Sequence, residues 1–315
     1  MLGCYSRLLL SRSVQGEFAR FNVMNKQKVL IFIAIQLFFW SCSGSKPNVA
    51  APANGQTVEP QEKAAESQSN SAETYHGIGV AYRYKHEYDK ALEYYEKAVE
   101  LASGDSTVNL AGLYSNIGEI YIQKHDYDKT IEYCKKAIEL DPYYAGSYLN
   151  IGVAYRNKQD YNSAIKSYEK VIELDPHDVD AYLNIGNVYF HQEDYDPAME
   201  FYKKSLEVNP DFGDAYGGIG SVYLAKEDYD KAIEHLNKAI ELNPEDAYAY
   251  RNAGYAYYKK ENYDKTIEYC KKAIELSPNT ATPYFYMGEA LIKKGDKDKG
   301  LEYKNKAMEL LEYEH

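Results

Sequence analysis

The chain has little of what catalysis or covalent cross-linking needs. Its 315 residues include four cysteines, one tryptophan, and seven histidines scattered along the sequence. No histidine stands at metal-ligand spacing from a cysteine or a carboxylate on one helix face. There is also no phosphate-binding loop, no G-x-S-x-G segment, and no nucleophile beside a candidate base. The sequence therefore predicts no catalytic residue, no metal and no cofactor, and it argues against an enzyme.

Positive charge is also in short supply. The chain holds 36 Lys and Arg against 48 Asp and Glu, which gives a formal net charge of −12. Residues 1–41 contain five Lys or Arg and one Glu, so the remainder carries a net charge of about −16. A chain this acidic is a poor ligand for nucleic acid or anionic lipid. Nothing in the sequence indicates a small-molecule substrate either.

The chain is rich in tyrosine, and its glycines and prolines recur at a fixed spacing. There are 35 tyrosines, and most fall on helical stripes, where they are expected to form core. Glycines recur every 34 residues from Gly118 to Gly288, and a further glycine, Gly79, precedes them. Five prolines keep the same step: Pro142, Pro176, Pro210, Pro244 and Pro278. A period of this length predicts one helix–turn–helix unit copied in tandem.

One unit, Ala145–Asp178, shows the pattern. Apolar and aromatic residues recur at i, i+3, i+4 and i+7 from Tyr148, and again from Tyr161 after a short polar turn. Pro176 is expected to stop the second helix, because it lacks an N–H and disfavours the helical conformation of the residue before it. Gly152 is small enough to let the two helices approach closely.

These residues resemble the tetratricopeptide repeat family. One copy of the family pattern reads Tyr182, Ile185, Gly186, Tyr189, Ala198, Tyr202, Ser205 and Pro210. The resemblance covers residues 72–314 and implies an all-α fold, a right-handed solenoid of seven helix–turn–helix repeats. The expected repeats are 72–110, 111–144, 145–178, 179–212, 213–246, 247–280 and 281–314.

Two repeats depart from the pattern. The spacing from Gly79 to Gly118 is 39 residues, and the extra residues fall in Ala102–Leu110, where we expect a longer loop or an extended second helix. The last repeat has Lys297, Gly300 and Lys304 where the preceding repeat has Tyr263, Thr266 and Cys270. A polar outer face on a terminal repeat is what capping a solenoid requires.

The N-terminal segment has the order of a secretory signal. A short basic stretch ending at Lys28 precedes Val29–Trp40, an apolar run of 12 residues. A spanning helix needs roughly 20 apolar residues, so the run is too short for one. Cys42 follows directly, as in the lipobox of bacterial lipoproteins, although Phe39 and Trp40 are bulkier than usual there. The resemblance implies cleavage before Cys42 and its lipidation; the alternatives are cleavage without lipid or a retained anchor.

Residues 1–41 are thus an upstream segment and signal peptide, and translation is expected to start at Met24. A rival interpretation is a transit peptide, because residues 1–23 contain three arginines and a single acid, but it leaves Cys42 unexplained. Residues 42–71 are rich in Ser, Ala, Gln and Pro, which predicts a disordered tether. The expected location is the bacterial envelope, on the periplasmic side or at the outer membrane.

The two cysteines within the repeats need no disulfide. Cys134 and Cys270 occupy the same second-helix place four repeats apart, beyond the ~7 Å limit between Cα atoms for a bridge. Both are expected to be small buried hydrophobes.

The resemblance also places a binding surface. First helices of such superhelices line the concave face, and Asn lies two residues before the repeat glycine in four repeats: Asn116, Asn150, Asn184 and Asn252. This row resembles the asparagine ladder of O-GlcNAc transferase, which implies a grip on a peptide backbone. Gly218 interrupts the row. The alternative is that Asn recurs in this repeat and stays solvated; in either case we expect these side chains to lie outside the core.

Apolar residues surround the row, with basic residues such as Arg83, Arg156, Arg251 and Lys259 among them. The predicted groove residues are Leu149, Leu183, Phe190, Tyr255, Tyr258 and Phe285. Such a groove suits an extended or helical protein segment. The sequence therefore favours a membrane-tethered adaptor that binds a protein segment and assembles an envelope complex. The alternatives are a self-associating structural subunit and a regulatory subunit of an enzyme.

Overall fold

The computed structural model describes residues 71–102 and 109–313, and there the chain consists of fourteen α-helices with no strand. The predicted signal segment, Cys42, the tether and most of the longer connection after Ala102 lie outside the described residues. The first helices of the seven pairs are α4 (Ala72–Tyr84), α6 (Leu110–Gln123), α8 (Ala145–Asn157), α10 (Val179–His191), α12 (Gly213–Ala225), α14 (Ala247–Lys259) and α16 (Ala281–Lys293). The second helices are α5 (Tyr88–Ala102), α7 (Tyr127–Leu140), α9 (Tyr161–Leu174), α11 (Tyr195–Val208), α13 (Tyr229–Leu242), α15 (Tyr263–Leu276) and α17 (Lys297–Tyr313).

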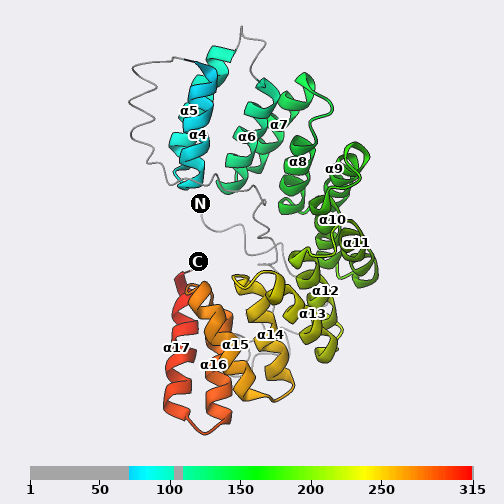
Figure 1. Ribbon diagram of the computed structural model, residues 1–315. Helices are drawn as coiled ribbons and strands as arrows, with labels where there is room; N and C mark the ends of the chain where they lie inside the picture. Colours follow the sequence, from blue (N-terminus) through cyan, green and yellow to red (C-terminus); the bar gives the residue numbers. More distant parts are fainter. Residues whose placement is uncertain (1–70, 103–108, 314–315) are drawn as a thin grey trace, which may run out of the picture. The chain divides into compact units, whose positions relative to one another are not determined.

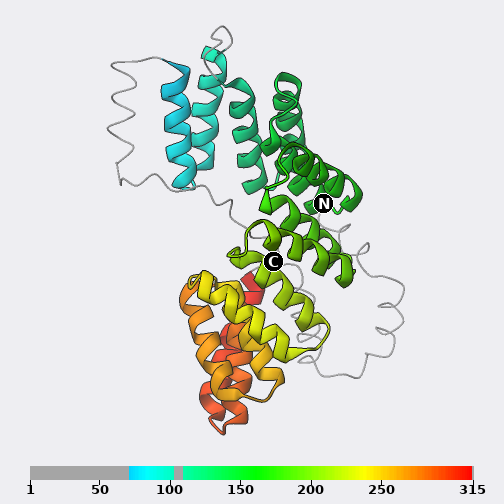
Figure 2. The same cartoon turned by 45° about the vertical axis from the view of Figure 1, so that its right-hand side comes forward.

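The pairs pack as a stack in chain order (Figures 1 and 2). Each first helix packs against the second helix of its own repeat, and that second helix packs against the first helix of the next repeat. From α6 onward, each first helix also contacts the first helix of the following repeat. The first helices therefore form a layer of their own, as the family resemblance implied.

The turn between the paired helices includes one residue with positive φ in each repeat. Gln159 has φ +61°, and the side chain of Asp160 then accepts a hydrogen bond from the backbone N–H of Ser163 to begin α9. Asp or Asn caps the second helix similarly at several other repeats. This cap satisfies an N–H that has no partner within the helix.

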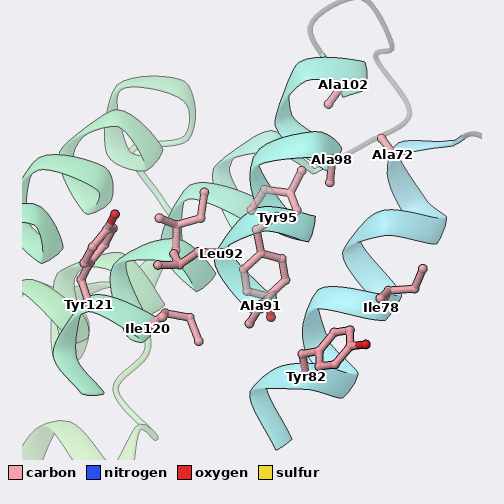
Figure 3. Close-up of a cluster of buried hydrophobic side chains, with 12 residues drawn as sticks. Ala72, Ile78, Tyr82, Ala91, Leu92, Tyr95, Ala98, Ala102, Ile120 and Tyr121 are labelled. Carbon is pink, nitrogen blue, oxygen red and sulfur yellow. The ribbon is translucent and has the colours of Figure 1, made fainter. Parts of the chain in front are cut away.

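The repeat glycines lie where the paired helices touch, as predicted. A Cβ added at Gly152 would lie 2.4 Å from Cε1 of Tyr168, and one at Gly79 would lie 2.5 Å from Cδ1 of Tyr95. Figure 3 shows Tyr95 in the buried cluster of the first repeat, between α4 and α5. Only glycine permits this approach, so its recurrence is a requirement of helix packing.

The cysteine interpretation is confirmed. Cys134 and Cys270 are free and fully buried, and burial raises the pKa of each thiol to about 12. They occupy the place that Tyr168 occupies in its repeat, against the repeat glycine.

The end of the stack differs in part from the prediction of a polar cap. Lys304 points inward and pairs with Glu289, and Gly300 is buried against Gly288. The outer side of α17 instead keeps Leu301 and Met308 about 40% exposed. The preceding repeat has isoleucines at these two places, Ile267 and Ile274. Those isoleucines pack against the first helix of the next repeat. The end therefore keeps part of an inter-repeat surface uncovered within the described chain.

Candidate protein-binding face

The first helices carry a second stripe beside the repeat glycine. It consists of the residues three before, one after and four after that glycine, and successive first helices meet along it. We call this stripe the first-helix face; it includes Leu149, Arg156, Leu183, Asn187, Phe190, Tyr255, Tyr258 and Phe285. The ion pair between Arg83 of α4 and Glu119 of α6 shows that side chains of this stripe reach across repeats.

The asparagine row bridges successive repeats. Asn116 bonds to His76 at 2.9 Å, and Asn150 donates to the backbone carbonyl of Ser115 at 3.3 Å. In both cases the partner lies in the first helix of the preceding repeat. These bonds align neighbouring first helices, a role that the sequence did not predict. A grip on a bound peptide stays a prediction for this row.

Two members of the row correct the expectation that these side chains lie outside the core. Asn184 is 4% exposed and Asn252 is fully buried. The amide of Asn252 donates to Ser221 Oγ at 3.3 Å and accepts from Arg251 Nε at 3.4 Å. The sequence pattern could not show this, because each amide also bonds to a side chain of the preceding repeat, Arg156 for Asn184 and Ser221 for Asn252.

Arg156 is a member of the face on α8. It is 5% exposed, and its Nη1 donates to Asn184 Oδ1 at 3.0 Å. The other end of that amide donates to the backbone carbonyl of Asp180 at 2.8 Å. Within the described part of the chain, no carboxylate lies at ion-pair distance from Arg156. A buried guanidinium with only a neutral acceptor keeps unused donors and an unbalanced charge.

The positive charge of Arg156 favours a lower pKa at two nearby groups. Burial and the Arg156 charge lower the pKa of His191 to about 4, so its imidazole is neutral at physiological pH. Burial raises the pKa of the Tyr168 hydroxyl to about 12, and Arg156 partly opposes this. That hydroxyl is fully buried and has no hydrogen-bond partner. The polar side chains shown near Arg156, those of Asn184, His191 and Tyr168, are therefore uncharged at physiological pH.

Four carboxylates gather at the N-terminal ends of α10, α12 and α14: Asp178, Asp180, Asp214 and Asp246. Burial, together with the charges of Asp178 and Asp214, raises the pKa of Asp180 to about 6. Burial is also the main cause of the raised pKa at the other three. We call these four residues the acidic group.

Three predicted groove residues meet near the C-terminal end of the face. The rings of Tyr255, Tyr258 and Phe285 lie with their centroids 5.0, 5.2 and 5.3 Å from that of Tyr286. Burial raises the pKa of the Tyr258 hydroxyl to about 12, with the nearby Glu289 carboxylate adding to the shift. We call the four rings the aromatic group. Tyr286 was not predicted as a site residue, because it replaces the asparagine of the row.

The remaining predicted groove residues are more enclosed. Leu183 is 3% exposed and Phe190 is 5% exposed, whereas Leu149 is half-buried against the cluster around Tyr168. Leu183 and Phe190 thus act mainly as core in the described conformation. Within the described ranges, no cluster of His, Cys, Asp or Glu is arranged to hold a metal ion, and none of the helices has the length and apolar character to cross a membrane.

Comparison with known proteins agrees with this geometry. Models of the tetratricopeptide repeat match residues 72–105, 111–144, 179–212 and 247–280, and a further one matches 133–166. A related TPR repeat model matches residues 154–193 and 220–261. Together these segments span more than half of the chain. No curated protein sequence shows a significant match.

Solved structures share the fold at low sequence identity. The complex of Cut9 with Hcn1 aligns with a TM-score of 0.62 and 18% identity over 74% of this chain and 46% of that one. A tetratricopeptide repeat protein from Parabacteroides merdae aligns with a TM-score of 0.57 and 18% identity over 76% and 93%. PilF of Pseudomonas aeruginosa aligns with a TM-score of 0.56 and 19% identity over 61% and 88%. These likenesses establish the architecture alone.

Proposed function

The chain belongs to the tetratricopeptide repeat family, whose repeats form protein–protein interaction scaffolds, and we propose that it is an envelope adaptor that binds a protein segment along the first-helix face. In this proposal an N-terminal lipid tethers the solenoid to a membrane, and the bound segment belongs to a complex that the adaptor helps to assemble.

The arrangement of the first-helix face carries the proposal. Its side chains change from repeat to repeat, while the close approach of the paired helices at the repeat glycine recurs. Arg156 without a carboxylate and the aromatic group are arrangements that close packing of the solenoid does not require. A surface whose side chains vary while the helical scaffold repeats is suited to recognising one partner.

Photo-crosslinking tests where the partner binds. A photoreactive benzoylphenylalanine at Leu149 or Phe285 places the probe on the face, and one at Glu132 or Glu200 places it on exposed second-helix surface. On illumination of native membranes, we expect discrete protein adducts from the first two positions only. Adducts confined to the Glu132 and Glu200 positions would assign binding to the second helices.

The lipid tether rests on Cys42 and on the apolar run before it. Cys42→Ala is expected to abolish lipid attachment and to move the protein from the membrane fraction to the soluble fraction. Mass spectrometry of the parent N-terminus and fractionation of both proteins provide the test. Equal membrane retention, with no lipid on the parent, would refute the tether but leave the binding face untouched.

One observation favours self-association as a second candidate function. Leu301 and Met308 stand exposed at inter-repeat places on α17, so a second copy has an apolar strip to cover. Sedimentation analysis of Leu301→Glu/Met308→Glu beside the parent tests this. A parent dimer that the double variant abolishes would support the structural subunit; a monomeric parent would exclude it at the concentration used.

A further inference from the structure

Two arginines occupy the same place in different repeats, and only one has an acidic partner. Arg83 and Arg156 each lie four residues after the repeat glycine. Arg83 forms an ion pair with Glu119, which lies one residue after the glycine of the following repeat. The residue equivalent to Glu119 beside Arg156 is Asn187, whose Oδ1 accepts a hydrogen bond from the Tyr202 hydroxyl at 2.8 Å. Arg156 therefore lacks the carboxylate that its own counterpart uses.

A second polar group at this place also lacks a partner. The Tyr168 hydroxyl is fully buried and unbonded, whereas its counterpart Tyr202 donates to Asn187. The reason is local: the residue after the glycine is Val153 in one repeat and Asn187 in the other. Leaving a buried hydroxyl unpaired costs free energy that a suitable acceptor would recover. The Tyr168 hydroxyl and the Arg156 guanidinium both need an acceptor.

We propose that Arg156, held by Asn184 and close to the unpaired Tyr168 hydroxyl, binds a carboxylate of the protein segment that occupies the first-helix face. The guanidinium offers paired N–H donors that match the two oxygens of a carboxylate. Asn184 holds Arg156 through its 3.0 Å bond and is itself fixed by its bond to the Asp180 carbonyl. The proposal rests on the proposed function, because it assigns one contact within that bound segment.

The small exposure of Arg156 determines how the ligand reaches it. Only a side chain or a chain end that enters between α8 and α10 can contact the guanidinium. Glu119 reaches Arg83 in this way between α4 and α6. Neutral His191 beside the site adds no competing charge. The net negative charge of the chain disfavours strongly acidic segments, so we expect a single carboxylate in an otherwise uncharged or basic segment.

The experiment selects peptides and then removes their charge. Random dodecapeptides are selected on the full-length protein, and the best binders are synthesised with the acidic residue or with its Gln or Asn counterpart, each with a free or an amidated C-terminus. Binding is measured by fluorescence anisotropy. We expect the peptides with a carboxylate to bind at least about tenfold more tightly than their uncharged counterparts, because a hydrogen bond to a charged group contributes more than a neutral one.

Two protein variants locate the carboxylate contact. Arg156→Gln removes the guanidinium, and Asn187→Glu supplies an internal carboxylate at the place where Glu119 serves Arg83. Both should bind charged and uncharged peptides equally, and circular dichroism should show parental helicity. Arg83→Gln is the matched control, since that arginine is already paired, and it should keep the tenfold preference. The two C-terminal forms show whether a side chain or a chain end supplies the carboxylate.

Several results would overturn the inference. They are equal binding of charged and uncharged peptides by the parent, failure to select any peptide, and a preference that persists in Asn187→Glu. Photo-crosslinking from Leu149 and Phe285 does not depend on peptide charge. Adducts there combined with a failed charge preference would reject this carboxylate site and leave the proposed function standing.

Discussion

The outer connections between repeats and the first-helix face obey different rules. On the outer side, Lys six residues after one glycine pairs with Asp of the preceding second helix in five places: Lys124–Asp89, Lys158–Asp128, Lys226–Asp196, Lys260–Asp230 and Lys294–Asp264. On the first-helix face, by contrast, the place four residues after each repeat glycine holds different residues: Arg83, Ile122, Arg156, Phe190, Leu224, Tyr258 and Ile292. Places that keep the period maintain the stack, whereas places that break it vary in residue type, and the proposed function assigns partner recognition to some of them.

The glycines should give the largest effect in a test of this division. Gly152→Ala places a Cβ 2.4 Å from the Tyr168 ring, which is itself fully buried and cannot move aside without cost. We expect the free energy of unfolding to fall by about 2–3 kcal/mol. The measurement is urea denaturation followed by circular dichroism.

Gly77→Ala is the matched control, because Gly77 lies in α4 outside the 34-residue period and a Cβ there meets nothing within 4 Å. The same chemical change should stabilise α4 by about 0.5–1 kcal/mol, since glycine is a poor helix former. If both variants were destabilised equally, close approach of the paired helices would not explain why the periodic glycines recur.

The acidic group breaks the period, and neutralising one of its members, Asp180, should improve stability. The folded-state pKa of Asp180 is about 6, above its ordinary value of 3.8, so the folded chain binds more protons than the unfolded chain between these values. Stability should therefore rise as the pH falls from 7 to 5. At pH 7, Asp180→Asn should raise the free energy of unfolding by about 1–2 kcal/mol.

Thermal melts of parent and Asp180→Asn at pH 5, 6 and 7 provide the measurement. The difference between the two proteins should shrink toward pH 5, where Asp180 is protonated. Asp196→Asn is the comparison variant, because the pKa of Asp196 is lowered by its hydrogen bond to Lys226 and its carboxylate is exposed. If Asp180→Asn were less stable than the parent at pH 7, the Asp180 charge would be shown to stabilise the stack.

These contrasts explain how far the sequence could be interpreted alone. The 34-residue period was enough to predict paired helices, the turn at Gln159, the close approach at Gly152 and the burial of Cys134, because each depends on neighbours within one repeat. Pro176 was expected to stop α9, which ends two residues earlier at Leu174. Local patterns carry this information directly.

The candidate site was less accessible to sequence reasoning. The asparagine row was identified, yet Asn184 and Asn252 each also bond to a side chain of the preceding repeat, Arg156 and Ser221, and this is not evident from either helix alone. Arg156 was noted only as one basic residue among several. Comparing each place across repeats would have shown that Glu119 has no acidic counterpart at Asn187, a signal that helical periodicity does not contain.

The turns between paired helices combine a periodic conformation with a variable residue. Glu227 has φ +56°, a left-handed conformation that costs a non-glycine residue free energy, whereas the last turn uses Gly295 with φ +96°. Glu227→Gly should therefore stabilise the chain by about 0.5–1 kcal/mol, less than the full steric cost because glycine also gains freedom when unfolded. The control, Glu234→Gly within α13, should destabilise it by about 1 kcal/mol. Loss of stability at both sites would mean that the Glu227 side chain itself matters.

The smallest effect is expected from completing the outer row of ion pairs. The one repeat junction without a Lys–Asp pair has Asn162 and Gln192 at the two equivalent places, so both charges are absent together. Asn162→Asp combined with Gln192→Lys should install the missing pair. The Asp partners elsewhere are 80–90% exposed, and such pairs contribute little, so the thermal midpoint should rise by only about 1–2 °C.

Each single variant, Asn162→Asp or Gln192→Lys, should leave the midpoint unchanged or slightly lower, because it adds a charge without its partner. The gain of the double variant should also disappear in high salt, which screens exposed charges. A gain that survives high salt would come from packing or helix propensity. A loss in the double variant would show that this junction, between the repeat of Arg156 and the next, requires neutral residues, and the outer side would then share the site-specific character of the first-helix face.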